Sequence, residues 1–247
     1  MIGWRARIGY ISPANAECSV YEFYKIVPEG VSLVTTCLSI KDLVPEELEA
    51  GLRKVDDAAL DLAKSEVDFI VLGGTPPGAL KGVGSDKKLI KRIEKSTKTP
   101  AVLKITASVE AFRHLKAKRI SVATPFEEPN NRKIKKFLED SGFVVANIKG
   151  LGIRSNLDIA RLPDYAPYQQ ARKTVLENPK TDAIYIPCSQ WSPSFCVNQL
   201  EKDFGIPVVT SNLSMIWYVF SALKLRGAIR GFGRLLEGLS LVNPNVA

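Results

Sequence analysis

The stretch Arg7-Ile8-Gly9-Tyr10-Ile11-Ser12-Pro13 has a second copy farther along the chain, Arg119-Ile120-Ser121-Val122-Ala123-Thr124-Pro125. Each copy is an apolar run that ends in a hydroxyl residue and a proline, a pattern typical of a buried strand followed by a loop. Further segments pair in the same order, with residues 68–75 matching 182–189 and residues 99–102 matching 206–209. The sequence therefore predicts two related halves.

Apolar β-branched runs alternate with amphipathic helical patterns in both halves. Strands are predicted at residues 7–11, 31–36, 68–72, 101–103, 120–123, 144–148, 183–186 and 207–209. Helices are predicted near residues 45–64, 130–140, 167–176, 194–203 and 215–225, and from residue 85. This alternation is typical of parallel sheets covered by helices.

We therefore expect an α/β fold with two pseudo-symmetric lobes. Each lobe is a roughly four-stranded parallel sheet flanked by helices, and the active site lies in the cleft between them. The first lobe comprises residues 1–104 plus 216–247, and the second comprises residues 105–215.

The composition is that of a packed globular protein. With 45% hydrophobic and 24% charged residues, the chain is neither disordered nor collagen-like, and four cysteines are too few for a disulfide scaffold. The apolar runs are well below the roughly 20 residues that span a bilayer, and the N-terminal residues lack a signal-peptide core. We expect a cytoplasmic protein without a membrane partner, either a monomer or a homodimer.

Basic residues outnumber acidic ones, which gives a formal net charge of +8. They are spread over helical patterns such as residues 87–95, where they alternate with apolar positions as on a solvated helix face. We therefore expect no nucleic-acid partner, and the positive field favours an anionic small substrate. The glycines of residues 73–78 lack the spacing of a phosphate-binding loop, and Pro76 and Pro77 offer no N–H groups to a phosphate.

Loops that follow the predicted strands carry the candidate functional residues. Ligands bind at the carboxyl ends of parallel strands, so the loops at residues 12–15, 73–78, 124–130 and 188–192 are expected to line the cleft. The repeat pairs Cys188 with Gly74, which places a thiol on one face of a substrate and no side chain on the other.

Cys188 is predicted to act as a proton donor or a nucleophile. Backbone N–H groups and the following helix are expected to lower the pKa of its thiol. The alternative is a small buried hydrophobe at the end of a strand.

The other cysteines and the single histidine are assigned to packing or to the surface. Cys37 is expected in the core, Cys196 packed on a helix, and His114 at the surface. Cys18 is expected in the core or partly exposed, with a position near the cleft as the alternative. Their spacing does not match a metal site, so we expect neither a metal nor a cofactor.

A set of short segments spans nearly the whole chain, in this order: Arg7-Ile8-Gly9-Tyr10-Ile11-Ser12-Pro13-Ala14-Asn15, Gly74-Thr75, Ala123-Thr124-Pro125-Phe126 with Asn131, Gly150-Leu151-Gly152-Ile153, Cys188, Ile206-Pro207-Val208-Val209-Thr210-Ser211 and Gly231-Phe232-Gly233-Arg234-Leu235. Together they resemble the aspartate/glutamate racemase superfamily. Within it, the chain is most similar to the arylmalonate decarboxylase and maleate cis-trans isomerase families. The resemblance covers about residues 6–240.

The resemblance implies a division of roles within the cleft. Racemases and isomerases of the superfamily carry one cysteine in each lobe, whereas this chain has Gly74 at the first position, as the decarboxylase does. In the decarboxylase pattern, Thr75 and the backbone N–H of Ser189 hold one carboxylate while the other leaves as CO2 from an apolar pocket. Cys188 then protonates the resulting enediolate. A two-cysteine racemase is therefore not expected.

Two positions differ from the decarboxylase pattern, Pro76 where that family has a serine and Phe126 where it has a tyrosine. Both changes remove a hydroxyl from the expected carboxylate site, and proline also lacks an N–H. Donors are expected from four residues of neighbouring loops, Ser12, Asn15, Ser189 and Ser192.

Asn15 and Asn156 match asparagines that the maleate isomerase pattern uses to hold a carboxylate. Phe126 and Trp191 are expected either to form an apolar wall of the cleft or to pack within their loops.

The leading prediction is a cofactor-independent decarboxylase of a substituted malonate-like carboxylic acid, with Cys188 as its only catalytic thiol. The alternatives are a maleate cis-trans isomerase or another isomerase of the superfamily, and a carboxylate-binding relative without turnover.

Overall fold

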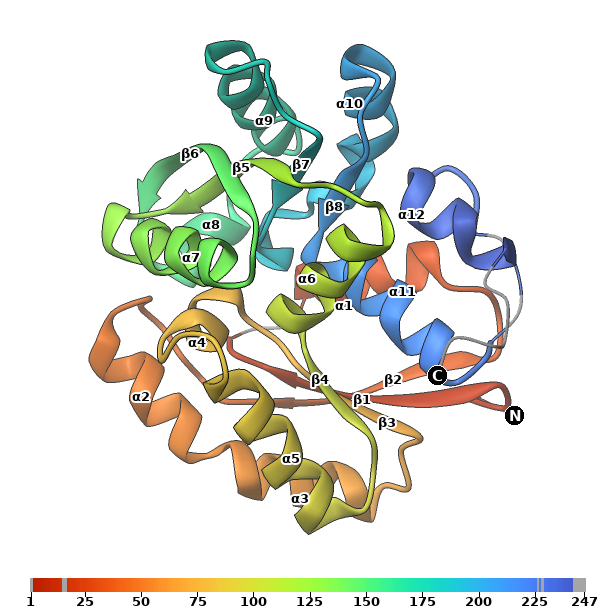
Figure 1. Ribbon diagram of the computed structural model, residues 1–247. Coiled ribbons are helices and arrows are strands. Elements are labelled where there is room, and N and C mark those ends of the chain that lie inside the picture. Colours follow the sequence, from red (N-terminus) through yellow and green to blue (C-terminus); the bar gives the residue numbers. More distant parts are fainter. Residues whose placement is uncertain (1, 15–16, 226, 228, 242–247) are drawn as a thin grey trace.

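The computed structural model describes residues 2–14, 17–225, 227 and 229–241. It contains two four-stranded parallel sheets (Figure 1). The first has the order β2-β1-β3-β4, and its strands are β1 (Ala6–Ser12), β2 (Val31–Cys37), β3 (Phe69–Leu72) and β4 (Ala101–Leu103). The second has the order β6-β5-β7-β8, and its strands are β5 (Arg119–Phe126), β6 (Val144–Ile153), β7 (Ala183–Ile186) and β8 (Val208–Thr210). The predicted α/β class with two related sheets is confirmed.

The two sheets have the same topology. In each, the first strand in sequence pairs with both the second and the third, and the fourth pairs with the third. The repeated stretches that contain Ile8 and Ile120 occupy this central first strand. The repeat in sequence is therefore a repeat of structure, while the lobe boundaries given above stay a prediction.

Helices cover both sheets. The helices of the first half are α1 (Glu17–Ile26), α2 (Pro45–Arg53), α3 (Val55–Lys64), α4 (Thr75–Ala79), α5 (Ser85–Thr97) and α6 (Lys104–His114). Those of the second half are α7 (Glu128–Asp140), α8 (Asn156–Ala160), α9 (Ala166–Glu177), α10 (Val197–Phe204), α11 (Ser211–Ala222) and α12 (Arg234–Glu237), with 3-10 turns η1 (Ser189–Trp191), η2 (Pro193–Cys196) and η3 (Gly238–Leu241). Figure 1 shows α2, α3 and α5 on the outer side of the first sheet, while α6 and α11 lie between the two sheets.

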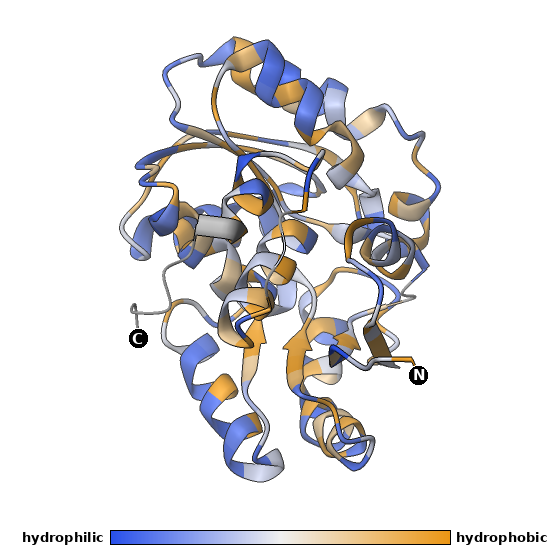
Figure 2. Cartoon of the chain, turned by 90° about the vertical axis from the view of Figure 1, so that its right-hand side faces the viewer, coloured by the Kyte–Doolittle hydropathy of each residue, from blue (hydrophilic) through white to orange (hydrophobic). Residues whose placement is uncertain are grey.

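The core consists of the strands and the helix faces packed against them. Every residue of β3, β4, β7 and β8 is buried, as parallel strands are when helices cover both faces of a sheet. Figure 2 shows the strands mainly in hydrophobic colours and the outer helices as alternating polar and apolar stripes. Such a core fixes the carboxyl ends of the strands, where the candidate residues lie.

Three expectations about local structure are wrong in detail. Residues 45–64 form two helices, α2 and α3, separated at Lys54. Part of the expected loop at residues 73–78 is the short helix α4, which tolerates Pro76 and Pro77 because the first turn of a helix needs no intrahelical N–H bond. Strand β5 continues through Phe126, so that residue ends a strand and does not lie on a loop.

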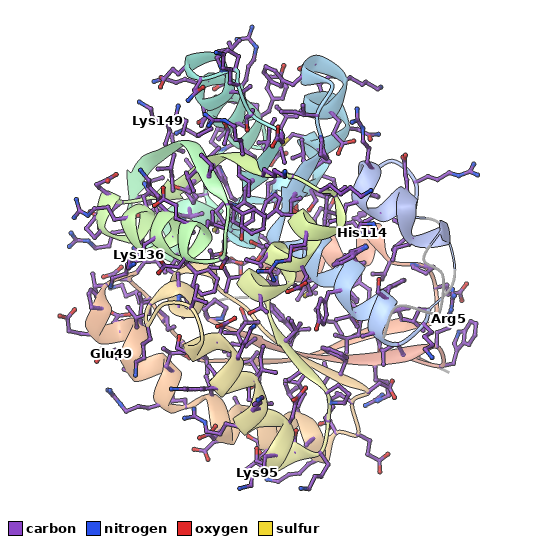
Figure 3. The ribbon with its side chains drawn as sticks, in the orientation of Figure 1. Arg5, Glu49, Lys95, His114, Lys136 and Lys149 are labelled. Atoms are coloured by element: carbon purple, nitrogen blue, oxygen red, sulfur yellow. The ribbon has the colours of Figure 1, made fainter. Side chains whose placement is uncertain are left out.

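Apart from Lys104, the lysines lie at the surface. Figure 3 shows Lys95, Lys136 and Lys149 at the periphery, on α5, α7 and β6, and two of them pair with nearby carboxylates of Asp140 and Glu177. In the part of the chain that the structure describes, no helix is long and apolar enough to cross a membrane.

Candidate active site

A pocket forms where the carboxyl ends of strands from both sheets meet. Most of the predicted site residues line it: Ser12, Gly74, Thr75, Pro76, Phe126, Asn156, Cys188 and Ser189. Its further lining residues are Tyr10, Pro13, Ser19, Leu43, Pro77, Gln190 and Ser211. The four expected segments of the cleft therefore all contribute to one pocket.

Three predicted residues are not part of this lining. Trp191 lies on η1 and is buried, but it belongs to the packed interior, and its indole nitrogen has no hydrogen-bond partner among the described residues. The apolar wall therefore includes Phe126 without Trp191. Ser192 does not line the pocket, and Asn15 lies outside the described residues.

Cys188 directly follows β7 in an unusual backbone conformation. Its φ is 122°, a region that L-residues rarely adopt and that costs on the order of 1–3 kcal/mol. The equivalent Gly74 after β3 has a φ of 87°, so both halves build the same kind of turn. Glycine adopts it without strain. A cysteine at such a strained position is a candidate for a functional group.

The position of Gly74, equivalent to Cys188 in the repeat, has no room for a second thiol. A Cβ atom on Gly74 would lie 2.6 Å from Cγ of Pro77 and 3.1 Å from Cγ of Pro13. Both neighbours are rigid rings, so they cannot move aside as the end of a long side chain would. Among the described residues that line the pocket, Cys188 therefore provides the only thiol.

The Cys188 thiol is a weak acid in this pocket. Burial raises its pKa to about 12, although the N–H groups of Gln190 and Trp191 and the Lys104 ammonium favour the thiolate. The expected lowering of the pKa is therefore wrong. Desolvation outweighs the donors, and the regular helix α10 begins only at Val197, after η1 and η2. At neutral pH the group is a protonated thiol, which can give a proton.

The other cysteines and the histidine are not among the lining residues, although Cys18 is close enough to Cys188 to affect its pKa. Cys37 is exposed at the end of an outer strand, so its expected place in the core is wrong. Cys18 and Cys196 are partly buried, and His114 is exposed with its ring 5.0 Å from that of Trp217. Among the described residues, no group of three potential ligands could hold a metal ion.

A chain of hydrogen bonds leads from the Cys188 backbone to Thr75. The Cys188 N–H donates to Ser211 Oγ at 3.1 Å, and Ser211 Oγ lies 3.4 Å from Thr75 Oγ1. Because Ser211 accepts the N–H, its own proton is free to point at Thr75. The Thr75 hydroxyl can then donate into the pocket.

Comparison of the chain with known proteins shows which family it belongs to. The family model described as arylmalonate decarboxylase matches residues 8–236. The chain belongs to the arylmalonate decarboxylase family. A maleate isomerase from Pseudomonas putida is 27% identical over 94% of this chain and 97% of its own length. The arylmalonate decarboxylase of Bordetella bronchiseptica is 24% identical over 93% and 96%.

Solved structures of both enzymes share this fold. A liganded arylmalonate decarboxylase variant, in which a glycine is replaced by cysteine and a cysteine by serine, superposes with a TM-score of 0.89 at 22% identity and covers 94% of this chain and 99% of that one. A cysteine-to-serine variant of Nocardia farcinica maleate cis-trans isomerase with a covalent succinylcysteine intermediate has a TM-score of 0.85 at 23% identity, covering 94% and 98%. The neighbours therefore include enzymes with cysteine-based catalysis.

This arylmalonate decarboxylase family member has a buried cation that the sequence analysis missed. Lys104, the first residue of α6, is 1% exposed. Its Nζ donates to Tyr10 Oη at 3.2 Å, to Ser189 Oγ at 3.1 Å and to Asn212 Oδ1. The only signal in the sequence is a lysine directly after the short apolar run Ala101-Val102-Leu103, at the edge of the sheet where ligands bind.

Glu22 completes the network on the side away from the pocket. Asn212 Nδ2 donates to one of its carboxylate oxygens, and the Ser194 N–H donates to the other at 2.7 Å. Burial raises the pKa of Glu22 to about 7 against these donors. Asn212 therefore links a buried ammonium to a buried carboxyl group.

Tyr10 stands between this cation and the pocket. Burial raises the pKa of its phenol, but the Lys104 ammonium and hydrogen bonds with Ser19, Lys104 and Ser189 outweigh burial and leave the pKa below 10.0. The Lys104 Nζ also lies 4.4 Å from the centre of the Tyr10 ring. The pocket lining therefore contains the polarised phenol of Tyr10, although Phe126 has no hydroxyl group.

Asn156 belongs to a junction between the two halves. Its Nδ2 donates to the Ile40 carbonyl at 2.9 Å, and its backbone N–H donates to the Lys41 carbonyl. Asn130 Nδ2 likewise donates to the Leu43 carbonyl. An amide nitrogen carries two protons, so Asn156 keeps one for a ligand, and its expected contact with a carboxylate stays a prediction.

Proposed function

We propose that this protein decarboxylates a substituted malonate without a cofactor, through an enediolate that Cys188 protonates. The supporting observation is the one-sided pocket, with a protonated thiol at Cys188 and no space for a thiol at Gly74. One acid on one face suits a single protonation, whereas racemisation by two thiols needs an acid or base on each face.

The lining provides a polar side and an apolar side. Thr75 and the backbone N–H of Ser189 hold the retained carboxylate, because donors aimed at developing negative charge stabilise the enediolate. Leu43, Pro76 and Phe126 surround the departing carboxylate, which leaves more readily as neutral CO2 from apolar surroundings. The cavity volume is about 20 Å³, which is smaller than a substituted malonate, so the proposal requires the pocket to widen when the substrate binds.

The reaction balances without an external oxidant or reductant. The bond between the α-carbon and the departing carboxylate breaks, and its electron pair forms the enediolate of the retained carboxylate while CO2 leaves. The α-carbon then takes the proton of the Cys188 thiol. The thiolate recovers a proton from water, and the hydroxide formed combines with CO2 as bicarbonate.

Proton NMR in D2O tests this proposal. The protein is given aryl- and alkyl-malonates, maleate and racemic amino acids, with Cys188→Ala as the test variant and Cys37→Ala as the matched control on an exposed cysteine. We expect loss of a malonate with one deuterium added, and a rate about 10²–10⁴-fold lower in Cys188→Ala, the usual contribution of a general acid. Cys37→Ala should match the native chain. Turnover that survives in Cys188→Ala contradicts the role of this thiol.

Isomerisation of maleate is the second candidate, favoured by the 27% identity to a maleate isomerase. It requires a cysteine to add to the double bond as a thiolate, and the pKa of about 12 at Cys188 disfavours that form. Conversion of maleate to fumarate in the same panel would decide for it. Binding of a carboxylate without any turnover would instead indicate a relative that has lost catalysis at Pro76 and Phe126.

A further inference from the structure

The two halves place different residues at one equivalent position beside the pocket. Lys104 begins the helix that follows β4, and Ser211 begins the helix that follows β8. Lys104 Nζ contacts Ser189 Oγ, whereas Ser211 Oγ contacts Thr75 Oγ1. Because Thr75 and Ser189 are themselves equivalent in the repeat, the two contacts are related by the same pseudo-symmetry. At this equivalent position, the first half therefore has the ammonium group of Lys104 and the second half has the hydroxyl group of Ser211.

The ammonium group restricts where a neighbouring hydroxyl proton can point. A lysine ammonium has three donors and no acceptor, so a hydroxyl that contacts it must accept. Ser189 Oγ accepts from Lys104, and its own proton must then point elsewhere. Ser189 lines the pocket and also contacts Tyr10, so this proton points either to a ligand in the pocket or to Tyr10 Oη.

Tyr10 is oriented in the same way. Its hydroxyl accepts from Lys104 at 3.2 Å, so the phenol proton points into the pocket, to Ser189 Oγ, or to Ser19 Oγ at 3.4 Å. Ser19 and Ser189 both line the pocket, so a serine that accepts from Tyr10 can give its own proton to a ligand. Each arrangement leaves a hydroxyl that can donate into the pocket.

Lys104 itself is held back from the pocket. Its third contact, the Asn212 side-chain oxygen, is anchored in turn by Glu22, and Lys104 is not among the lining residues. All three of its protons are therefore used within the protein. Apart from the electric field of its charge, Lys104 can act on a ligand only through the hydroxyls of Tyr10 and Ser189.

We infer that Lys104 is a positioning residue that turns the Tyr10 and Ser189 hydroxyls into donors for a substrate carboxylate beside Cys188. These donors take the place of the hydroxyls that Pro76 and Phe126 do not offer. The inference rests on the proposed function only for the class of ligand, a carboxylate. It does not require that the protein turn that ligand over.

Alkylation of Cys188 by two reagents tests the inference without turnover. Iodoacetate carries a carboxylate and iodoacetamide is neutral, and in both cases the thiolate attacks the methylene carbon and iodide leaves. The rate ratio of the two reagents at Cys188, followed by peptide mass mapping, reports carboxylate recognition and cancels differences in thiolate fraction. Exposed Cys37 in the same chain is the internal control.

We expect Lys104→Met to lower this ratio at Cys188 about tenfold, the effect of losing one hydrogen bond to a charged group, and to leave the ratio at Cys37 unchanged. Lys136→Met, which removes an exposed charge, should change neither ratio. An unchanged ratio at Cys188 in folded Lys104→Met overturns the inference. A Cys188 that neither reagent reaches in the native chain overturns it as well.

Two milder variants separate positioning from simple charge and remain informative if Lys104→Met does not fold. Tyr10→Phe and Ser189→Ala keep the ammonium but remove the hydroxyls that it orients. Both should lower the Cys188 ratio, since charge alone would leave it intact. The NMR panel measures decarboxylation separately. A failure of the Lys104 inference, seen in the alkylation ratio, can therefore be distinguished from a failure of the proposed function, seen as absent turnover.

Discussion

The turn after β3 and the turn after β7 share a backbone shape but differ in chemistry. In the first, Gly74 with φ 87° leads into a proline-containing helix, and in the second, Cys188 with φ 122° leads into a 3-10 turn. The first turn gives a hydroxyl at Thr75 and a rigid wall, whereas the second gives the thiol. A pocket formed from two equivalent halves has thus become one-sided, which suits a reaction that needs one acid.

Within the first turn, the largest effect on catalysis is expected from Thr75. Thr75→Val keeps the shape of the side chain but removes the hydroxyl that receives the Ser211 contact. If this hydroxyl holds the developing charge, kcat/KM falls about 10²–10³-fold, as for loss of one oxyanion donor. Steady-state kinetics on the malonate found by NMR measure it. Activity within a few-fold of the native chain would move the carboxylate site away from the first turn.

The buried carboxyl group on the Lys104 side is expected to affect stability through pH. The pKa of Glu22 is about 7 in the folded chain against 4.5 as the ordinary value, so the folded state binds more protons between these limits. Its contribution to the free energy of unfolding is therefore fully present below pH 4.5 and decreases as pH rises to 7, by up to about 3 kcal/mol.

Urea unfolding at several pH values compares the native chain with Glu22→Gln. The difference in unfolding free energy between the two should change across this pH window in the stated direction. Parallel pH profiles for the two chains would show that Glu22 titrates normally.

Substitution of Gly74 tests whether steric crowding excludes a side chain from the first turn. Gly74→Ala places Cβ 2.6 Å from the Pro77 ring at a positive φ, whereas Gly142→Ala also has a positive φ but meets no atom within 4 Å. We expect a loss of about 2–4 kcal/mol at Gly74, where overpacking adds to backbone strain, and about 1 kcal/mol at Gly142. Chemical denaturation gives both values. Equal losses would mean that Pro77 moves aside at no cost.

The smallest effect concerns the backbone under the thiol. Cys188→Gly and Cys188→Ala both lack the sulfur, but only alanine keeps a Cβ at φ 122°. We expect the glycine variant to be more stable than the alanine variant by about 1 kcal/mol, because relief of strain exceeds the entropy cost of glycine. Thermal unfolding compares them. A more stable alanine variant would show that Cys188 is not strained.

The sequence was sufficient for the features that depend on local pattern. The repeat around Ile8 and Ile120 predicted the two sheets, and the positions after the strands predicted the pocket that contains Thr75 and Cys188. These succeed because apolar periodicity and the position of ligands in parallel sheets follow from short stretches of chain.

The features that depend on long-range packing were not predictable. Lys104 and Glu22 are polar residues on separate helices, and only folding brings both to Asn212. The sign of the pKa shift at Cys188 was wrong because burial, which the sequence does not display, outweighs nearby N–H groups. Cys37 was misplaced because β2 is an edge strand, and its pairing partners are not local.

The most direct test of the one-sided site is the stereochemistry of the product. A malonate with two different α-substituents is decarboxylated in D2O, and the product is analysed by chiral chromatography and NMR. Protonation by Cys188 alone, with Gly74 bare on the other side, predicts one enantiomer carrying one deuterium at the α-carbon. A racemic product from the native chain would contradict the account, because it requires proton delivery to both faces.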